Sequence, residues 1–161
     1  MASAIAERLH ATGADTLVDV FGGSAAVTLN AGFEKRVYND ASGDLVNLFR
    51  VISHPLKRKL LLDRLKWTPC SRRIFKDDYA IYLRGNFSFS LIRNEMDRAR
   101  ATLYRQLLSW GGKARSGGFS VSSGDCCGIK EIRRYQSVLR KLSTIGEYFR
   151  GTIIENLDYR D

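Results

Sequence analysis

The 161-residue sequence is long enough for one domain with a buried core, and the lack of a long apolar run excludes a membrane-spanning protein. Three cysteines, two of them adjacent, and two distant histidines predict neither a disulfide framework nor a metal site, and they favour the cytoplasm. The formal charge of +9 makes nucleic acid the first partner to consider.

The first 54 residues alternate between strand and helix patterns. Residues 16–21 (TLVDVF) are apolar and β-prone, and the glycine pair and SAAVTLN that follow predict a tight turn and a helix with Ser24 near its N-cap. A second short strand is predicted over 35–39, and a helix with a clear apolar face follows over 44–52. Strands and helices that alternate through short turns predict a parallel βαβ unit.

The middle of the sequence is strongly basic and mainly helical. Residues 1–54 hold four Lys/Arg and six Asp/Glu, net −2, whereas residues 55–150 hold 21 and eight, net +13. A solvated helical surface on an unrelated protein is the alternative to a nucleic-acid surface. Helical patterns are interrupted by the Gly/Ser-rich segment GGKARSGGFSVSSGDCCG, and TIIENLDY is a third β-like segment near the end. The sequence therefore predicts an α/β sheet unit, interrupted by a basic helical insertion, to which the third strand returns last.

The glycine turn is typical of a small-molecule site. A strand that feeds a glycine turn and then a helix points backbone amides at a ligand, and an acid after the next strand suits ribose hydroxyls. Asp40 is the acid after the second strand, and Asp19 lies on the first strand just before the glycine turn. The Gly-x-Gly-x-x-Gly pattern of dinucleotide sites is absent, so a pyrophosphate is poorly supported. S-adenosylmethionine has an adenosine, no phosphate and a charged amino-acid end, and it fits better. An ordinary turn with surface acids remains the alternative.

Several segments, in order, resemble the Dam-type DNA adenine methyltransferases. DVFGGSAAVTLN and VYNDASGDLVNLFRVI resemble the first two motifs of that family, and TPCSRRIF resembles the opening of its DNA-recognition insertion. SWGGKARSGGFSVS resembles the glycine-rich hairpin of that insertion, and GTIIENLDYRD resembles the third strand with its Asn-x-Asp-aromatic ending. Together these segments cover roughly residues 16–161, nearly the whole chain.

The resemblance implies an incomplete Rossmann-like sheet of an S-adenosylmethionine-dependent methyltransferase, divided into residues 1–54, a DNA-recognition insertion over 55–135, and a return helix and third strand over 136–161. It implies that double-stranded DNA binds the insertion. The cofactor-binding residues that it implies are Asp19, Phe21, Gly22, Gly23 and Ser24 at the turn, Asp40 at the ribose, and Asp158 and Tyr159 at the adenine. The candidates for DNA contacts are Arg72, Arg73, Lys113 and Arg115, each of which is explained about as well as solvated surface charge.

Two motifs of the family have no counterpart in this sequence. MASAIAERLHATG lacks the aromatic-Gly-x-Lys motif whose Lys holds the methionine end of the cofactor. Asp-Pro-Pro-Tyr, which in the family follows the third strand and grips the extruded adenine, is also missing, since the only prolines are Pro55 and Pro69. The amino group of adenine is a poor nucleophile. The base must therefore be extruded from the duplex, and its amino group must be aligned with the methyl group. No catalytic residue is therefore predicted, and Cys126 and Cys127 are interpreted as plain thiols.

Three functions remain open from the sequence. The first is a truncated DNA adenine methyltransferase that is inactive alone, and the second is a non-catalytic DNA-binding or regulatory protein derived from that fold. The third is half of a split enzyme, with a second polypeptide supplying the missing strand. A nicotinamide-dependent oxidoreductase is disfavoured because the third glycine is missing. An unpaired sheet edge and uncovered apolar surface predict marginal stability or self-association.

Overall fold

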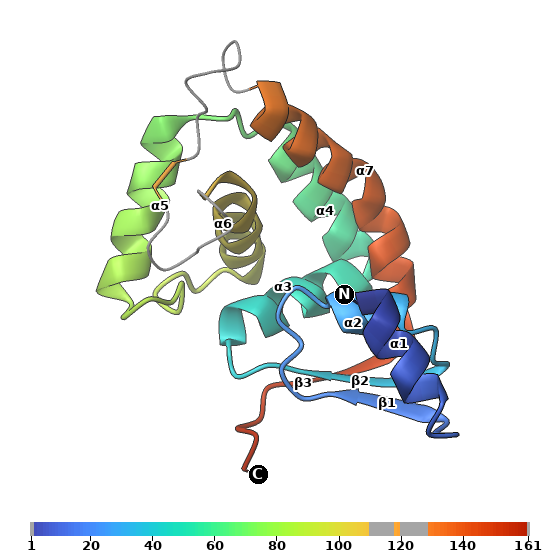
Figure 1. The fold of residues 1–161 in the computed structure, drawn as a ribbon. Helices are drawn as coiled ribbons and strands as arrows, with labels where there is room; N and C mark the ends of the chain where they lie inside the picture. Colours follow the sequence, from blue (N-terminus) through green and yellow to red (C-terminus); the bar gives the residue numbers. More distant parts are fainter. Residues whose placement is uncertain (1, 110–117, 120–128, 161) are drawn as a thin grey trace.

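The computed structural model describes residues 2–109, 118–119 and 129–160, and Figure 1 shows a small sheet at one end with helices extending away from it. Its elements, in chain order, are α1 (Ala2–His10), β1 (Thr16–Asp19), α2 (Ala26–Asn30), β2 (Lys35–Asn39), α3 (Gly43–Ser53), α4 (Pro55–Lys66), α5 (Arg72–Arg84), α6 (Glu95–Leu108), α7 (Ile129–Arg150) and β3 (Thr152–Glu155). None of the helices in this described part has the length and hydropathy needed to cross a membrane.

The three strands form a parallel sheet in the order β1-β2-β3. Val37 in the central strand pairs with Val18 on one side and with Ile153 on the other. The parallel arrangement and the mixed α/β class predicted from the sequence are confirmed. β1 ends at Asp19, two residues earlier than the apolar run indicated, because the chain turns away from β2 to enter the glycine turn.

One face of the sheet carries the main core. Side chains of a strand alternate between faces, so Tyr38 points to the helices while its neighbour Val37 points away. Tyr38 is fully buried and meets the rings of Phe49 from α3 and Phe149 from α7 edge-on, at centroid distances of 4.8 and 5.6 Å. The apolar stripe predicted for the helix over 44–52 is therefore the surface that packs on the sheet.

The opposite face of the sheet leaves apolar side chains in solvent. Val18 is 57% exposed and Ile153 is 59% exposed, and they flank the half-buried Val37 in one row across all three strands. Among the described residues, no helix packs on this row. Parallel sheets are normally covered on both faces, so the row fits the uncovered apolar surface that the sequence predicts.

The basic helices stand beyond α3, and α7 runs back past them to the sheet (Figure 1). Arg58 of α4 is buried, donates to the Ile52 carbonyl at 3.1 Å and forms an ion pair with Glu147 of α7. Gly146 makes room for this contact, since an added Cβ would lie 2.2 Å from Arg58 Nη1. α7 continues as one helix through residue 135, where the sequence predicts the end of the insertion, and the domain boundaries stay predictions.

Candidate functional site

Three loops meet at the carboxyl end of the sheet. Because the strands are parallel, the segments that follow β1, β2 and β3 leave the sheet at the same edge, as Figure 1 shows. These segments are residues 20–25, 40–42 and 156–160. Seven of the eight cofactor residues predicted from the sequence lie in them, and Asp19 closes β1 directly before the first. In open α/β sheets this edge is where ligands bind.

The glycine turn depends on the absence of side chains. The Gly22 N–H donates to the Asn39 carbonyl at 2.8 Å, and a Cβ on Gly22 would lie 2.1 Å from the ring of Tyr38. Gly23 has φ +50°, a left-handed conformation that glycine adopts without strain. The N-cap of α2 is Ala25, with φ 59° and no side-chain cap bond, so the cap lies next to Ser24 as the sequence predicts, although Ser24 itself does not cap the helix. The turn's own left-handed path, not a serine cap, starts the helix.

Asp40 fastens the glycine turn to the turn that follows β2. Its Oδ2 accepts from the Gly23 N–H at 2.8 Å, and its Oδ1 accepts from the Ser42 N–H at 2.7 Å. An ionised carboxylate has about four acceptor positions, so roughly two remain for a ligand. The half-buried carboxylate is thus both oriented by the backbone and able to accept further hydrogen bonds.

Asp19 and Tyr38, from the two strands next to the glycine turn, hold the turn and the helix after it by hydrogen bonds. Asp19 Oδ2 accepts from the Thr28 hydroxyl at 2.7 Å, which ties β1 to α2. The Tyr38 hydroxyl donates to the Gly23 carbonyl at 2.9 Å. Burial, together with the charges of Asp40 and Asp19, raises the pKa of Tyr38 well above its usual range. The phenol therefore stays a neutral donor, and it holds the turn at every ordinary pH.

The segment after β3 brings Tyr159 beside Phe21 from the glycine turn. The two ring centroids lie 5.8 Å apart at an interplanar angle of 46°, within the range of direct aromatic pairs. Both rings are largely exposed, so either offers a face on which a base stacks. Both carboxylate oxygens of Asp158 are paired with Arg160, which lowers the pKa of Asp158. A ligand contact from Asp158 therefore competes with Arg160.

Two asparagines complete this edge and were not singled out from the sequence. Asn39, the buried last residue of the central strand, donates to the carbonyls of Val20 and Leu157 at 3.1 Å each and accepts from the Leu157 N–H at 2.8 Å. Asn156 donates to the Asp40 carbonyl at 2.7 Å. An amide side chain can donate and accept at once, which suits a residue placed between loops on both sides. An asparagine at the end of the predicted middle strand is the sequence feature that could have identified Asn39.

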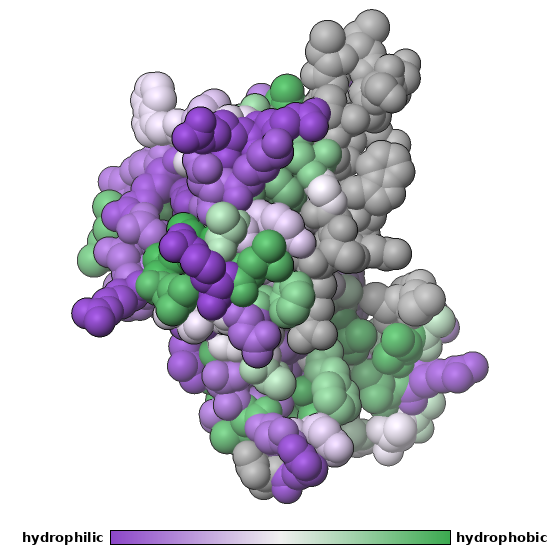
Figure 2. All heavy atoms as spheres, turned by 90° about the vertical axis from the view of Figure 1, so that its left-hand side faces the viewer, coloured by the Kyte–Doolittle hydropathy of each residue, from purple (hydrophilic) through white to green (hydrophobic). Residues whose placement is uncertain are grey.

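The predicted DNA contacts lie elsewhere, on the helical insertion. Arg72 and Arg73 are exposed in the first turn of α5, where Arg72 lies 5.6 Å from the ring centroid of Phe119 and Arg73 pairs with Asp77 at 3.1 Å. Hydrophilic side chains gather on the face that α5 presents (Figure 2). The other two predicted contacts, Lys113 and Arg115, lie outside the described residues.

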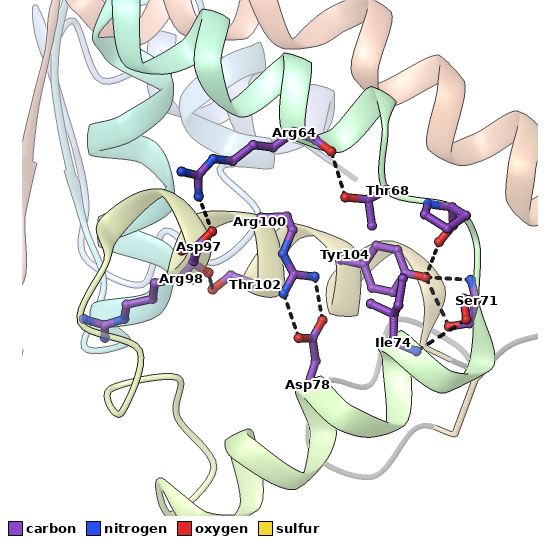
Figure 3. A network of polar contacts seen from close by, with 11 residues as sticks. Arg64, Thr68, Ser71, Ile74, Asp78, Asp97, Arg98, Arg100, Thr102 and Tyr104 are labelled. Carbon is purple, nitrogen blue, oxygen red and sulfur yellow. Dashed lines mark hydrogen bonds and ion pairs between the residues drawn. The ribbon is translucent and has the colours of Figure 1, made fainter.

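The start of α5 is anchored from α6, as Figure 3 shows. The Tyr104 hydroxyl accepts from the Ser71 N–H at 2.8 Å and donates to the Pro69 carbonyl at 2.9 Å. Ser71 is the N-cap of α5, with its side chain accepting from the Ile74 N–H. The TPCSRRIF segment is therefore held by a buried phenol, which fixes the start of the helix that carries Arg72 and Arg73.

A cavity of about 570 Å³ lies between α3, α6 and α7 and reaches Gly23 and Ser24. Its walls are mainly apolar, with Leu48, Leu103 and Leu142 among them, and neither Asp40 nor Tyr159 lines it. Among the described residues, no group of three or more His, Cys, Asp and Glu side chains is arranged to hold a metal ion.

Comparison with protein families gives a match. The family model described as D12 class N6 adenine-specific DNA methyltransferase matches residues 1–110. The matched range contains the glycine turn, Asp40 and the helices from α3 to α6, whereas Asp158 and Tyr159 lie beyond it. A comparison with individual curated proteins gives no match.

Proposed function

Because the chain belongs to the D12 class N6 adenine-specific DNA methyltransferase family, we propose that it binds S-adenosylmethionine at the carboxyl edge of its sheet and duplex DNA on its helical insertion. S-adenosylmethionine is the methyl donor of such enzymes in general, and adenine in DNA is the family's substrate. The observation that carries the proposal is the convergence of three loops around an oriented Asp40 carboxylate with acceptor positions to spare.

The residues at this edge fit the cofactor part by part. Asp40 accepts from the two ribose hydroxyls, because its backbone partners occupy only about half of its acceptor positions. The adenine stacks on the exposed ring of Tyr159 or Phe21. The glycine turn would hold the methionine end, and its backbone path depends on Gly22, where a Cβ would collide with the ring of Tyr38. When bound, the cofactor supplies an electrophilic methyl group.

The DNA part of the proposal is supported by charge and geometry. The net charge of +13 over residues 55–150 favours a polyanion. Arg72 and Arg73 project from a helix start that Tyr104 and Ser71 fix in place. These two arginines contact phosphates or base edges, and Arg73 exchanges its exposed pairing with Asp77 for the DNA at little cost, since exposed ion pairs are weak.

Methyl transfer itself needs groups that this sequence does not provide. The chain's own residues hold the cofactor and grip the duplex, but the printed sequence has no Asp-Pro-Pro-Tyr to hold the extruded adenine. We therefore propose a methyltransferase part that is inactive by itself. A non-catalytic DNA-binding or regulatory role is the second candidate, and it is favoured by the basic insertion, which needs no cofactor to attract DNA.

A second polypeptide that completes the enzyme is favoured by two observations. The apolar row of Val18, Val37 and Ile153 is uncovered, and β1 pairs on only one side among the described strands. In the doubly wound strand order 3-2-1-4, the next strand pairs with strand 1 and the ligand lies at that junction. A polypeptide that adds a strand beside β1 and a helix on the apolar row would complete both the sheet and the site.

The test is calorimetric titration with S-adenosylmethionine and, separately, with NAD. We expect saturable 1:1 binding of S-adenosylmethionine and none of NAD, because the turn has no third glycine for a pyrophosphate. Fluorescence anisotropy with a labelled duplex should give binding that weakens steeply with salt. Duplex binding without cofactor binding would favour the regulatory alternative, and methylation of DNA by the purified chain alone would refute the inactivity.

A further inference from the structure

Asp44 is a buried residue that joins the carboxyl edge of the sheet, which we call the cofactor edge, to the helical insertion. It is the second residue of α3 and is only 5% exposed. Its Oδ2 accepts from the Phe89 N–H at 2.9 Å, and its Oδ1 accepts from Arg98 Nε at 2.7 Å. Phe89 lies in the segment between α5 and α6, and Arg98 is on α6. One carboxylate therefore fastens two parts of the insertion to the start of α3.

Residues 40–44, which we call the junction segment, connect this carboxylate to the proposed cofactor site. At one end is Asp40, whose backbone carbonyl accepts from Asn156 in the loop after β3. In the middle is Gly43, where an added Cβ would lie 3.2 Å from Arg98 Nη2 and 3.4 Å from Asn156 Oδ1. Only three residues thus separate Asp40, the group proposed to hold the ribose, from Asp44, the group that holds the insertion.

The contacts on the insertion side are firm. Phe89 is 1% exposed, and its ring lies 5.0 Å from that of Tyr82, in a small apolar cluster that includes Ala101 of α6. A buried carboxylate that loses its partner costs far more than an exposed one, so the Asp44 contacts are not given up easily. Movement or ordering of the junction segment is therefore passed on to the start of α6.

On the basis of the proposed function, we infer that Asp44 is a positioning residue that couples the cofactor edge to the DNA-recognition insertion, so that S-adenosylmethionine and duplex DNA each strengthen the binding of the other. The coupling reaches the predicted DNA contacts through α6, because Tyr104 of α6 holds Ser71 and Pro69 at the start of α5. Linkage requires the same coupling factor in both directions, and such factors are typically about 5–150-fold.

The same network contains a matched control pair. The Arg100–Asp78 ion pair has the same 2.7 Å distance as Arg98–Asp44, and both aspartate side chains are 7% exposed. In Figure 3, Arg100 points to α5, whereas Arg98 leaves α6 in another direction. Asp78→Asn therefore removes an equally buried ion pair of the insertion without touching the junction segment.

Hydrogen exchange read by mass spectrometry tests the coupling on the full chain, with S-adenosylmethionine as the probe. In the wild type we expect the cofactor to slow exchange in residues 20–25 and 40–44 and also in 86–101. Asp44→Asn should keep the first effect and lose the second, and Asp78→Asn should keep both. Arg98→Lys, which retains the charge, should restore part of the effect on 86–101 relative to Arg98→Gln.

Duplex affinity measured with and without cofactor gives the second readout. We expect roughly a tenfold gain in the wild type and in Asp78→Asn, and a gain below about twofold in Asp44→Asn. Wild-type protection confined to 20–25 and 40–44 would overturn the coupling while the proposed cofactor site stands. An equal loss in Asp78→Asn would overturn the assignment to Asp44. A wild type that binds no cofactor would refute the proposed function, and the coupling with it.

Discussion

Replacing Gly22 with alanine should destabilise the protein through the buried ring of Tyr38. The added Cβ would lie 2.1, 2.4 and 2.8 Å from three ring carbons, where ordinary contacts begin at about 3.4 Å, so the ring has to retreat by more than 1 Å. It has no open space to enter, because Phe49 and Phe149 meet it edge-on and it is 0% exposed. The backbone of Gly22 is not left-handed, so the cost is one of packing alone.

Overpacking of a full core costs about 1–3 kcal/mol, and displacing the ring breaks the Tyr38 hydrogen bond to Gly23, worth about 0.5–1.5 kcal/mol. We therefore expect Gly22→Ala to lower the free energy of unfolding by roughly 2–4 kcal/mol. In a chain of this size that corresponds to a fall in Tm of roughly 5–15 °C. Calorimetry or circular dichroism measures it directly.

Two further variants make the result interpretable. Gly151→Ala is the control, because its Cβ would make an ordinary 3.4 Å contact with Arg36, and its Tm should stay near that of the wild type. Tyr38→Leu removes the ring, so adding Gly22→Ala to it should cost much less than adding it to the wild type. A Gly22→Ala protein with a wild-type Tm, or costs that simply add in the double variant, would refute the packing argument.

Three other outcomes follow from the described contacts. Burial raises the pKa of Tyr135, whose hydroxyl donates to Leu65, so its contribution to stability is complete below the unfolded pKa of about 10 and is lost as pH rises above it. Urea midpoints should therefore fall more steeply above about pH 10 in the wild type than in Tyr135→Phe. Neutralising Arg72 and Arg73 to Gln should reduce the slope of log affinity for duplex against log salt by up to roughly 2, and an unchanged slope would place the DNA elsewhere. Ile153→Lys should raise the concentration at which the chain self-associates in sedimentation experiments, because it places a charge in the apolar row. An unchanged concentration would show that the apolar row is not the self-association contact.

The repeating patterns of the sequence identified most of the fold. The strand at 35–39 and the helix over 44–52 lie where alternation and apolar spacing predict them, because each element has one face in the core. The sequence predicts the N-cap of α2 near Ser24, and the structure has it at the next residue, Ala25. Ser24 is a common N-cap type, but the turn enters the helix through left-handed Gly23 and Ala25, and alanine gives no sequence signal for that conformation.

The candidate site was predictable in its location and less so in its connections. Glycines and acids after parallel strands meet at one sheet edge by topology alone, which is why Asp40 and Gly23 could be assigned together. Asn39 contacts Leu157, which is 118 residues away in sequence, and Asp44 contacts Phe89, which is 45 residues away, and no local pattern predicts these partners. The pairing of Asp158 with Arg160 was not predicted either, because it depends on a local turn that residue spacing alone does not define.

The most direct test of the central claim is to locate S-adenosylmethionine on the protein by backbone amide shifts in a ¹⁵N-labelled sample. We expect the largest changes at Gly22, Gly23 and Ser42, whose N–H groups lie in or beside the Asp40 contacts, and at Tyr159. Asp40→Asn should weaken the binding by roughly tenfold or more, the cost of hydrogen bonds to a charged group. Shifts confined to the cavity between α3, α6 and α7, or none at saturating cofactor, would contradict it.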